Sequence, residues 1–218
     1  MAGAPRGRHN LREECKPMSV ANESAEPRVF EMKVTLEGST PAIWRRIRVT
    51  TDVSLARLHH ILQATMGWGE LYHHQFIIRG RCYGRPDPDG QVHDERRYTL
   101  GQVVKRAASR FTYEYDFGDG WIHEVVVERI LPWQAEAHYP VCVAGERACP
   151  PEDVGGLYGY YDFLDALQNA SIPGHERALE WIGGSFDPDA FDLDTVNRRL
   201  RHLAAPARRE KALQQKRS

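Results

Sequence analysis

Residues 113–123 read Tyr-Glu-Tyr-Asp-Phe-Gly-Asp-Gly-Trp-Ile-His. Aromatic and polar residues alternate before the glycines, which is the period of a half-buried strand. Gly118 and Gly120 permit the positive φ angles that a tight turn needs. The stretch therefore predicts a β-hairpin with arms at 111–116 and 121–130, and Phe111, Tyr113 and Tyr115 are expected on one face of its first arm.

Carboxylates and an imidazole gather on this hairpin. If residues 117–120 form the turn, Glu114 lies opposite His123. The side chains of Glu114, Asp116 and His123 then share one face of the hairpin. Carboxylates near an imidazole raise its pKa and orient it for acid–base work, or they supply ligands to a metal ion. The alternative is architectural: Asp116 and Asp119 stabilise the turn, and His123 is a cross-strand partner. Catalytic candidates are thus Asp116, Asp119 and His123.

Strands are expected in the first two thirds of the chain and helices in the last third. Apolar periodicity, Asp52 or Ser54 as an N-cap and Gly67 as a C-cap predict one helix among the strands. The expected strands are 29–36, 43–49 and 72–78, and the expected helices are 55–66, 99–104, 157–169, 175–183 and 192–203. Segments 83–98 and 140–156 read as loops. The order favours an α+β fold, with a mixed or antiparallel sheet formed mainly by residues 29–130 and C-terminal helices packed on it.

Composition and charge set limits on the class of protein. The net charge is −1, which gives no overall attraction to nucleic acid or membrane. No apolar run approaches the roughly 20 residues of a membrane span, and residues 1–27 lack a secretory signal. We expect a cytoplasmic protein with reduced cysteines, made of a disordered tail at 1–27, one domain at 28–204 and a basic tail at 205–218.

Two adjacent histidine pairs occur, His59-His60 and His73-His74. Neighbouring residues point to opposite sides of a helix or strand, so we expect only one ring of each pair to face a given site. His74 with His123 is the pair that we would test first. The sequence shows no helix-borne HExxH spacing.

Cysteine spacing does not match a zinc site. Six residues separate Cys142 from Cys149, whereas zinc-binding cysteine pairs are usually two to four residues apart. No cofactor is predicted, and a divalent metal ion is kept as an alternative. Its candidate ligands are His74, His123, Cys142 and Cys149.

Two motifs together resemble a known family. The first runs from Tyr115 to Glu124 as Tyr-Asp-Phe-Gly-Asp-Gly-Trp-x-His-Glu, and the second from Pro150 to Gly156 as Pro-Pro-Glu-Asp-x-Gly-Gly. Supporting stretches are residues 41–46, 66–68, 74–76 and 186–188. The chain, over roughly residues 29–203, resembles the plasmid pRiA4b ORF-3-like family.

The resemblance implies a compact α+β domain of uncharacterised function, sometimes labelled an insertion-element passenger with a resolvase-type name. Relatives often read His-Leu-His where this chain has Tyr-His-His at 72–74, so only His74 carries over. They often have a cysteine where this chain has Val154. No serine-nucleophile or tyrosine-recombinase constellation supports the resolvase label.

Three functions compete. The sequence favours a non-enzymatic interaction or adaptor protein associated with plasmids or mobile elements, with an unknown protein partner and no membrane. The residues expected to bind are Trp44, Trp68, His74, Trp121, Glu152 and Asp153. A metal-dependent or acid–base hydrolase using Asp116, Asp119 and His123 is the first alternative. The second is a nucleic-acid-binding accessory protein using Arg45, Arg46, Arg48 and the basic C-terminus.

Overall fold

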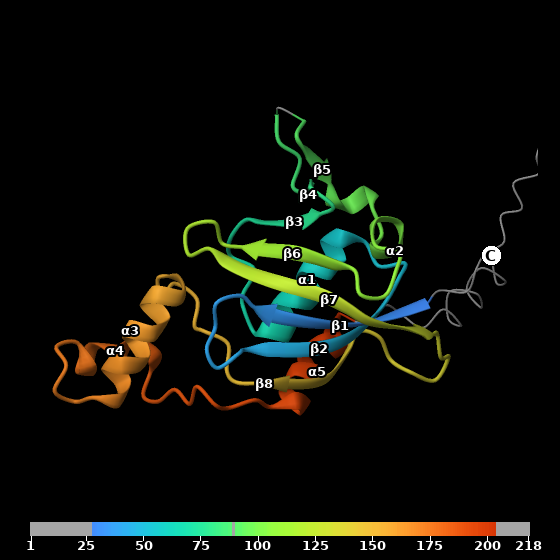
Figure 1. The fold of residues 1–218 in the computed structure, drawn as a ribbon. Coiled ribbons are helices and arrows are strands. Elements are labelled where there is room, and N and C mark those ends of the chain that lie inside the picture. The colour runs from blue at the N-terminus through green and yellow to red at the C-terminus, as the bar shows by residue number, and fades with distance from the viewer. Residues whose placement is uncertain (1–27, 89, 204–218) are drawn as a thin grey trace, which may run out of the picture.

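The computed structural model describes residues 28–88 and 90–203, in which eight strands form one sheet (Figure 1). The strands are β1 (Arg28–Leu36), β2 (Trp44–Thr50), β3 (His74–Ile78), β4 (Arg81–Gly84), β5 (Val92–Asp94), β6 (Arg110–Tyr115), β7 (Trp121–Pro132) and β8 (Val141–Glu146). Their order across the sheet is β5-β4-β3-β6-β7-β1-β2-β8. The β4–β5 pair is parallel and the other pairs are antiparallel, so the sheet is mixed.

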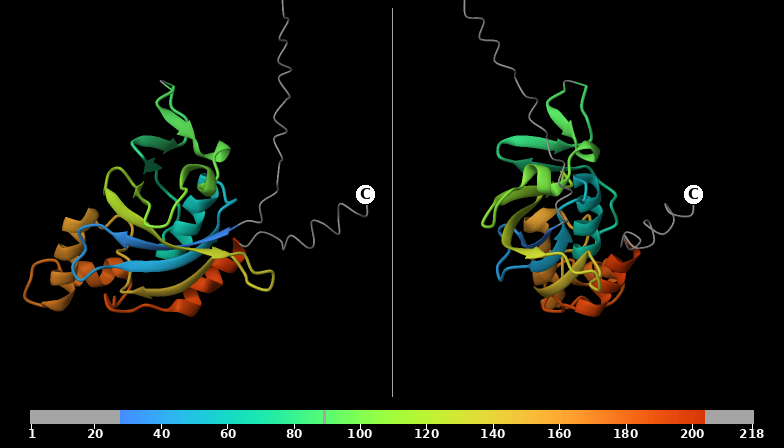
Figure 2. Two further views of the ribbon diagram at one scale, coloured as in Figure 1. Left: turned by 45° about the vertical axis from the view of Figure 1, so that its right-hand side comes forward. Right: turned by 90° about the vertical axis from the view of Figure 1, so that its right-hand side faces the viewer.

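Helices cover one face and one end of this sheet. They are α1 (Leu55–Met66), α2 (Leu100–Val103), α3 (Gly156–Gln168), α4 (His175–Ile182) and α5 (Leu193–His202), with a 3₁₀ turn, η1 (Glu95–Arg97). Helices α1 and α5 lie against the same face, and α3 and α4 extend beyond the end where β6 turns into β7 (Figures 1 and 2). This arrangement confirms the predicted α+β fold.

Helix α1 supplies the side chains that meet the centre of the sheet. The Ser54 side chain accepts a hydrogen bond from the backbone N–H of Arg57, and Gly67 ends the helix in the left-handed conformation at φ 99°. Gly67 was the predicted C-cap, and Ser54 was one of the two predicted N-cap candidates. Leu58 and Leu62 are fully buried, and His59 lies with them on the covered side. The apolar stripe of α1 thus carries an imidazole into the core.

Two predicted loops contain strands. Within 83–98, β4 and β5 pair in parallel and Tyr83 is buried against Tyr98. Within 140–156, β8 pairs with β2 as an edge strand, and the side-chain amide of Asn197 from α5 bonds both backbone groups of Cys142. These strands are short and rest on long-range partners, which local composition does not reveal.

The predicted tails at 1–27 and 205–218 lie outside the described residues. The prediction of a single domain at 28–204 stays a prediction. Among the described helices, none is both long and apolar enough to cross a membrane.

Candidate functional site

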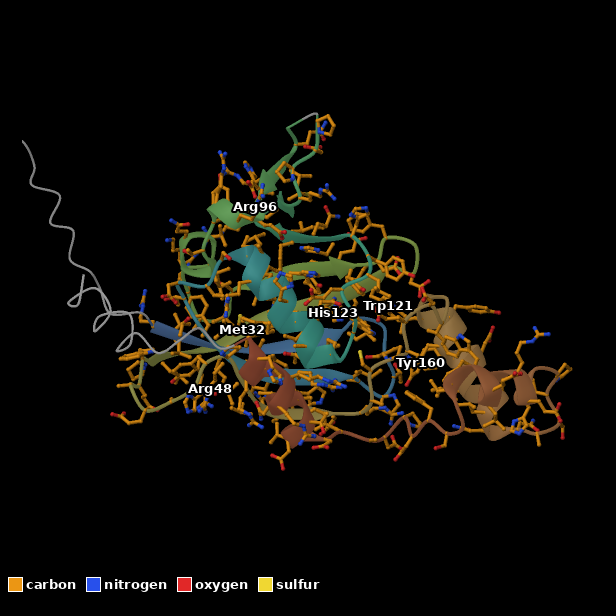
Figure 3. All side chains as sticks on the ribbon, turned by 180° about the vertical axis from the view of Figure 1, so that it is seen from behind. Met32, Arg48, Arg96, Trp121, His123 and Tyr160 are labelled. Atoms are coloured by element: carbon orange, nitrogen blue, oxygen red, sulfur yellow. The ribbon has the colours of Figure 1, made fainter. Side chains whose placement is uncertain are left out.

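The hairpin register differs from the predicted one. Tyr113 pairs with His123 and Tyr115 with Trp121, so the turn spans five residues rather than four. The extra residue is Asp116, which adopts a left-handed conformation at φ 52° and leaves the strand. His123 therefore lies on the buried, aromatic face beneath α1 (Figure 3). The expectation that His123 shares a face with Glu114 and Asp116 is wrong.

The two turn aspartates are held by backbone groups. Asp116 Oδ1 accepts hydrogen bonds from the N–H groups of Gly118 (3.0 Å) and Asp119 (3.4 Å), and its own N–H donates to the carbonyl of His73 (2.8 Å). Asp119 Oδ2 accepts from the N–H of Gly155 (3.2 Å), at the start of α3. Both carboxylates serve the architecture, as the alternative interpretation expected.

Residues of the second motif, 150–156, form hydrogen bonds with the first motif and with the segment after α1. Glu152 accepts hydrogen bonds from the Tyr115 hydroxyl (2.6 Å) and from the N–H of Gly69 (2.8 Å). Asp153 accepts one from the Tyr72 hydroxyl. These contacts and those of the turn aspartates join three segments, 67–73, 116–120 and 150–156, which we call the loop end. Both predicted binding acids, Glu152 and Asp153, are thus used to hold it together.

The tryptophans do not form a common surface. Trp68 and Trp121 are buried and their rings lie 5.7 Å apart, and Trp68 donates to the carbonyl of Pro150. Trp44 lies on the opposite, outer face of the sheet, where Lys33 stands over its ring at 4.8 Å. A partner surface centred on all three tryptophans is therefore wrong, because two of them are in the core.

His123 is a buried imidazole with an unpaired nitrogen. Its Nδ1 approaches the carbonyl oxygen of Tyr113 at 3.3 Å, whereas Nε2 has no hydrogen-bond partner in the structure. Burial lowers the pKa of His123 to about 4. The ring of Tyr113 contacts both His123 and His74, so it stands between the two histidines that were expected to form a pair.

The arginines expected to bind nucleic acid have structural partners. Arg45 is buried and donates to the carbonyls of Trp44 and Glu146. On the outer face of the sheet, Arg46 pairs with Glu128 at 2.6 Å and Arg48 with Glu31 at 2.8 Å. Glu128 and Glu31 thus neutralise the positive charges that would be needed to bind the phosphate groups of a nucleic acid.

The candidate cysteine ligands are poorly suited to a metal. Burial raises the pKa values of the Cys142 and Cys149 thiols, whereas metal binding needs the thiolate. The Cys142 thiol donates to the carbonyl of Ala144. Among the described cysteines, Cys82, Cys142 and Cys149 are all free thiols.

A second polar cluster lies between α1 and β3. The imidazoles of His59 and His74 are parallel, with centroids 3.5 Å apart, and His74 Nε2 lies 2.8 Å from Glu95 Oε2. His59 Nδ1 lies 2.7 Å from the Tyr113 hydroxyl, which also accepts a hydrogen bond from Gln63 Nε2 at 2.9 Å. Burial, together with the nearby His74 and His60, lowers the pKa of His59 to about 3.

The rest of this cluster is more exposed. His60 Nδ1 lies 2.8 Å from Glu70 Oε2, and His59, His60 and Glu70 each offer a ligand atom within 4.8 Å of the others. The expectation that adjacent histidines cannot face one site does not hold for His59 and His60. Sequence reasoning did not identify Glu70, which joins the cluster only when the chain reverses after α1, or Gln63, which lies one helical turn after His59.

Large apolar side chains are exposed at the loop end. Leu71 is 67% exposed, Phe117 is 53% exposed, and Tyr72 is also exposed. His73 stacks on Phe117 with centroids 6.5 Å apart, and the N–H of Leu71 donates to the Tyr115 hydroxyl, so 71–73 runs beside the turn. We call Leu71, Tyr72 and Phe117 the apolar patch.

Comparisons with known proteins agree with the sequence motifs. The profile of the family described as "Plasmid pRiA4b ORF-3-like protein" matches residues 28–195. The uncharacterized protein y4hQ of Sinorhizobium fredii (strain NBRC 101917 / NGR234) is 38% identical over 181 residues, which are 81% of this chain and 93% of that protein. The crystal structure of a protein of unknown function from Methanosarcina mazei Go1 is similar, with a TM-score of 0.71 and 34% identity, over 78% of this chain and 97% of that chain.

Proposed function

The chain belongs to the plasmid pRiA4b ORF-3-like protein family, and from that premise we propose that it is a non-enzymatic interaction domain that binds a protein partner at its loop end. The family's name is what supports an association with plasmids or other mobile elements. The relatives described above carry no assigned activity, so the argument rests on the geometry of this chain.

One observation carries the proposal. The polar side chains of the two motifs are engaged within the protein: Asp116 and Asp119 bind backbone N–H groups, and Glu152 binds Tyr115 and Gly69. These bonds hold three loops together, and what the loops present outward is the apolar patch. A rigid support under exposed aromatic side chains is the usual anatomy of an interface centre, because little ordering entropy is lost on binding.

The surroundings of the patch indicate the chemistry of the partner. Asp153, which is exposed, accepts from the Tyr72 hydroxyl, and Asp119 lies on the neighbouring turn of the loop end. An apolar centre with a carboxylate rim suits a protein surface that offers an apolar or aromatic side chain flanked by lysine or arginine. A rim of carboxylates mainly raises the rate at which such a partner binds and the specificity of that binding.

The two alternatives have less support. A hydrolase built on the hairpin needs Asp116, Asp119 and His123 around one substrate, but His123 is enclosed beneath α1 and the aspartates bind turn and helix N–H groups. For nucleic-acid binding, Arg45 is buried and Arg46 and Arg48 are paired with carboxylates, while the basic segment at 205–218 lies outside the described residues.

Site-specific photo-crosslinking tests the proposal. A benzophenone amino acid replaces Phe117 in the full chain, which is expressed in its native host. The matched control places it at Tyr158, which is 81% exposed on α3 and outside the patch. We expect a discrete adduct from position 117, absent from position 158 and lost on adding Leu71→Asp. Equal adducts at both positions, or none at position 117, would contradict the proposal.

A further inference from the structure

We propose that His59, His60 and Glu70 hold a divalent transition-metal ion of the zinc class, between α1 and the segment that leads into β3. The site is separate from the cysteines and from His123, and it does not depend on the proposed partner interaction. Among residues 28–88 and 90–203, these three side chains form the one group of at least three His, Cys, Asp or Glu residues whose ligand atoms lie close enough together to hold a metal ion.

The spacing of the donor atoms suits one ion. His60 Nδ1 and Glu70 Oε2 are 2.8 Å apart, and all three donors lie within 4.8 Å of one another. Zinc–ligand bonds of about 2.1 Å in a tetrahedron place neighbouring donors about 3.4 Å apart, which lies between these two values. Small rotations of the half-exposed His60 and Glu70 side chains are therefore enough to close the site.

Ring orientation separates the ligands from a neighbour. A metal ion lies in the plane of the imidazole that binds it. The planes of His59 and His60 are inclined by 55°, so they intersect, and one ion can lie in both. The planes of His59 and His74 are inclined by only 2° and lie 3.5 Å apart at the centroids. His74 therefore packs on the ligand His59 and does not share its ion.

Buried hydrogen bonds already connect two of the ligands. The N–H of Glu70 donates to Gln63 Oε1 (3.2 Å), Gln63 Nε2 donates to the Tyr113 hydroxyl (2.9 Å), and that hydroxyl bonds His59 Nδ1 (2.7 Å). Metal-binding histidines usually have their second ring nitrogen fixed in this way, which selects the tautomer and leaves the other nitrogen for the ion. Here Nδ1 is occupied by Tyr113, so Nε2 of His59 is the nitrogen available.

The backbone conformation at Glu70 is also unusual. Glu70 adopts a left-handed conformation at φ 61°, which is unfavourable for residues other than glycine. Binding of the ion by the Glu70 carboxylate would explain why a residue other than glycine occupies this position.

The donor set points to the class of ion. Two imidazoles and one carboxylate suit zinc and its first-row neighbours, whereas magnesium and calcium prefer all-oxygen sites. Three protein ligands leave a fourth position for water or for a ligand atom of a bound molecule. The zinc class is therefore the one to test.

Metal titration of the full chain tests the assignment. The chelator-treated protein is titrated with Zn²⁺ by calorimetry and with Co²⁺ by absorption spectroscopy, because the d–d bands report the number and type of ligands. Glu70→Gln and His60→Ala remove ligands that are half exposed, so the variants should fold, which circular dichroism checks. His138→Ala, which removes an exposed imidazole between β7 and β8, is the matched control.

We expect one Zn²⁺ per chain in the wild type and in His138→Ala. Each ligand variant should bind at least about tenfold more weakly, since even a lost second-shell partner costs that much in known sites. Loss of the tetrahedral cobalt spectrum in Glu70→Gln would support the same assignment. Wild-type affinity in both ligand variants would overturn it, and so would a wild-type chain that binds no Zn²⁺ at micromolar concentration.

Discussion

The Tyr115 hydroxyl donates a 2.6 Å hydrogen bond to the carboxylate of Glu152, and this bond joins the two sequence motifs that mark the chain. Tyr115 ends β6, and Glu152 precedes α3. Burial, followed by the hydrogen bond to Glu152, raises the pKa of Tyr115, so the hydroxyl remains a donor at neutral pH. The motifs thus meet as one structural unit at the end of the sheet.

Removing this hydroxyl should destabilise the protein. In Tyr115→Phe, Glu152 loses a donor and the N–H of Leu71 loses its acceptor. A hydrogen bond to a charged group contributes about 1.5–3 kcal/mol, so we expect a loss of that size in the free energy of unfolding. Urea denaturation measures it, with Tyr158→Phe on the exposed side of α3 as the control. Equal stability of the two variants would contradict this role.

Much of the fold could be predicted because its periodicity is local. The alternating aromatics of β6 and the apolar stripe of α1 indicate their buried faces without any knowledge of tertiary contacts. The hairpin register could not be predicted, because it depends on the left-handed conformation of Asp116, which residues other than glycine adopt only occasionally, although Asp does so more often than most. One residue in the turn moved His123 to the opposite face of the predicted hairpin.

The histidine–carboxylate cluster shows a different limit. His59 and Glu70 are eleven positions apart, with a helix end and a chain reversal between them, and no short motif describes that path. His59 lies on the buried side of α1, but the contact of α1 with β3 comes from the order of strands in the sheet. Sequence reasoning therefore found the imidazole and missed its neighbours.

Close packing between the hairpin turn and α3 gives a second prediction. A Cβ atom on Gly156 would lie 2.4 Å from the carbonyl oxygen of Asp119, whereas one on Gly120 would meet nothing within 4 Å. The two glycines have nearly the same φ, 69° and 68°, so the left-handed conformation destabilises an alanine by a similar amount at each position. Gly156→Ala should lose about 1–3 kcal/mol more than Gly120→Ala in urea denaturation. An equal loss would show that the turn and α3 can separate without cost.

His123 should make the stability of the protein depend on pH. Its pKa is about 4 in the folded state against 6.5 for a free histidine, so between these values the unfolded chain binds more protons. The free energy of unfolding therefore falls as the pH drops through this window, by roughly 1.4 kcal/mol per pH unit from this histidine alone. Above pH 6.5 the contribution is fully present.

A substitution isolates this contribution from other titrating groups. His123→Leu removes the imidazole with its unpaired Nε2 and puts an apolar side chain in its place beneath α1. Urea denaturation at several pH values between 7 and 4.5 should give a shallower dependence in the variant than in the wild type. His138→Ala, at an exposed imidazole, should retain the wild-type dependence. Parallel curves for wild type and His123→Leu would contradict the assignment.

Tyr113 should control the affinity of the proposed metal site without binding the ion. Its hydroxyl holds His59 Nδ1, and Gln63 holds the hydroxyl. When an ion binds Nε2, the ring proton must lie on Nδ1, and the phenol oxygen can accept it because a hydroxyl has two acceptor lone pairs. Tyr113→Phe removes that acceptor and keeps the three ligands, so Zn²⁺ affinity should fall about tenfold or more with unchanged stoichiometry. Tyr158→Phe, which removes an exposed hydroxyl on α3, should keep the wild-type Zn²⁺ affinity. Equal affinities in Tyr113→Phe and the wild type would remove Tyr113 from the site.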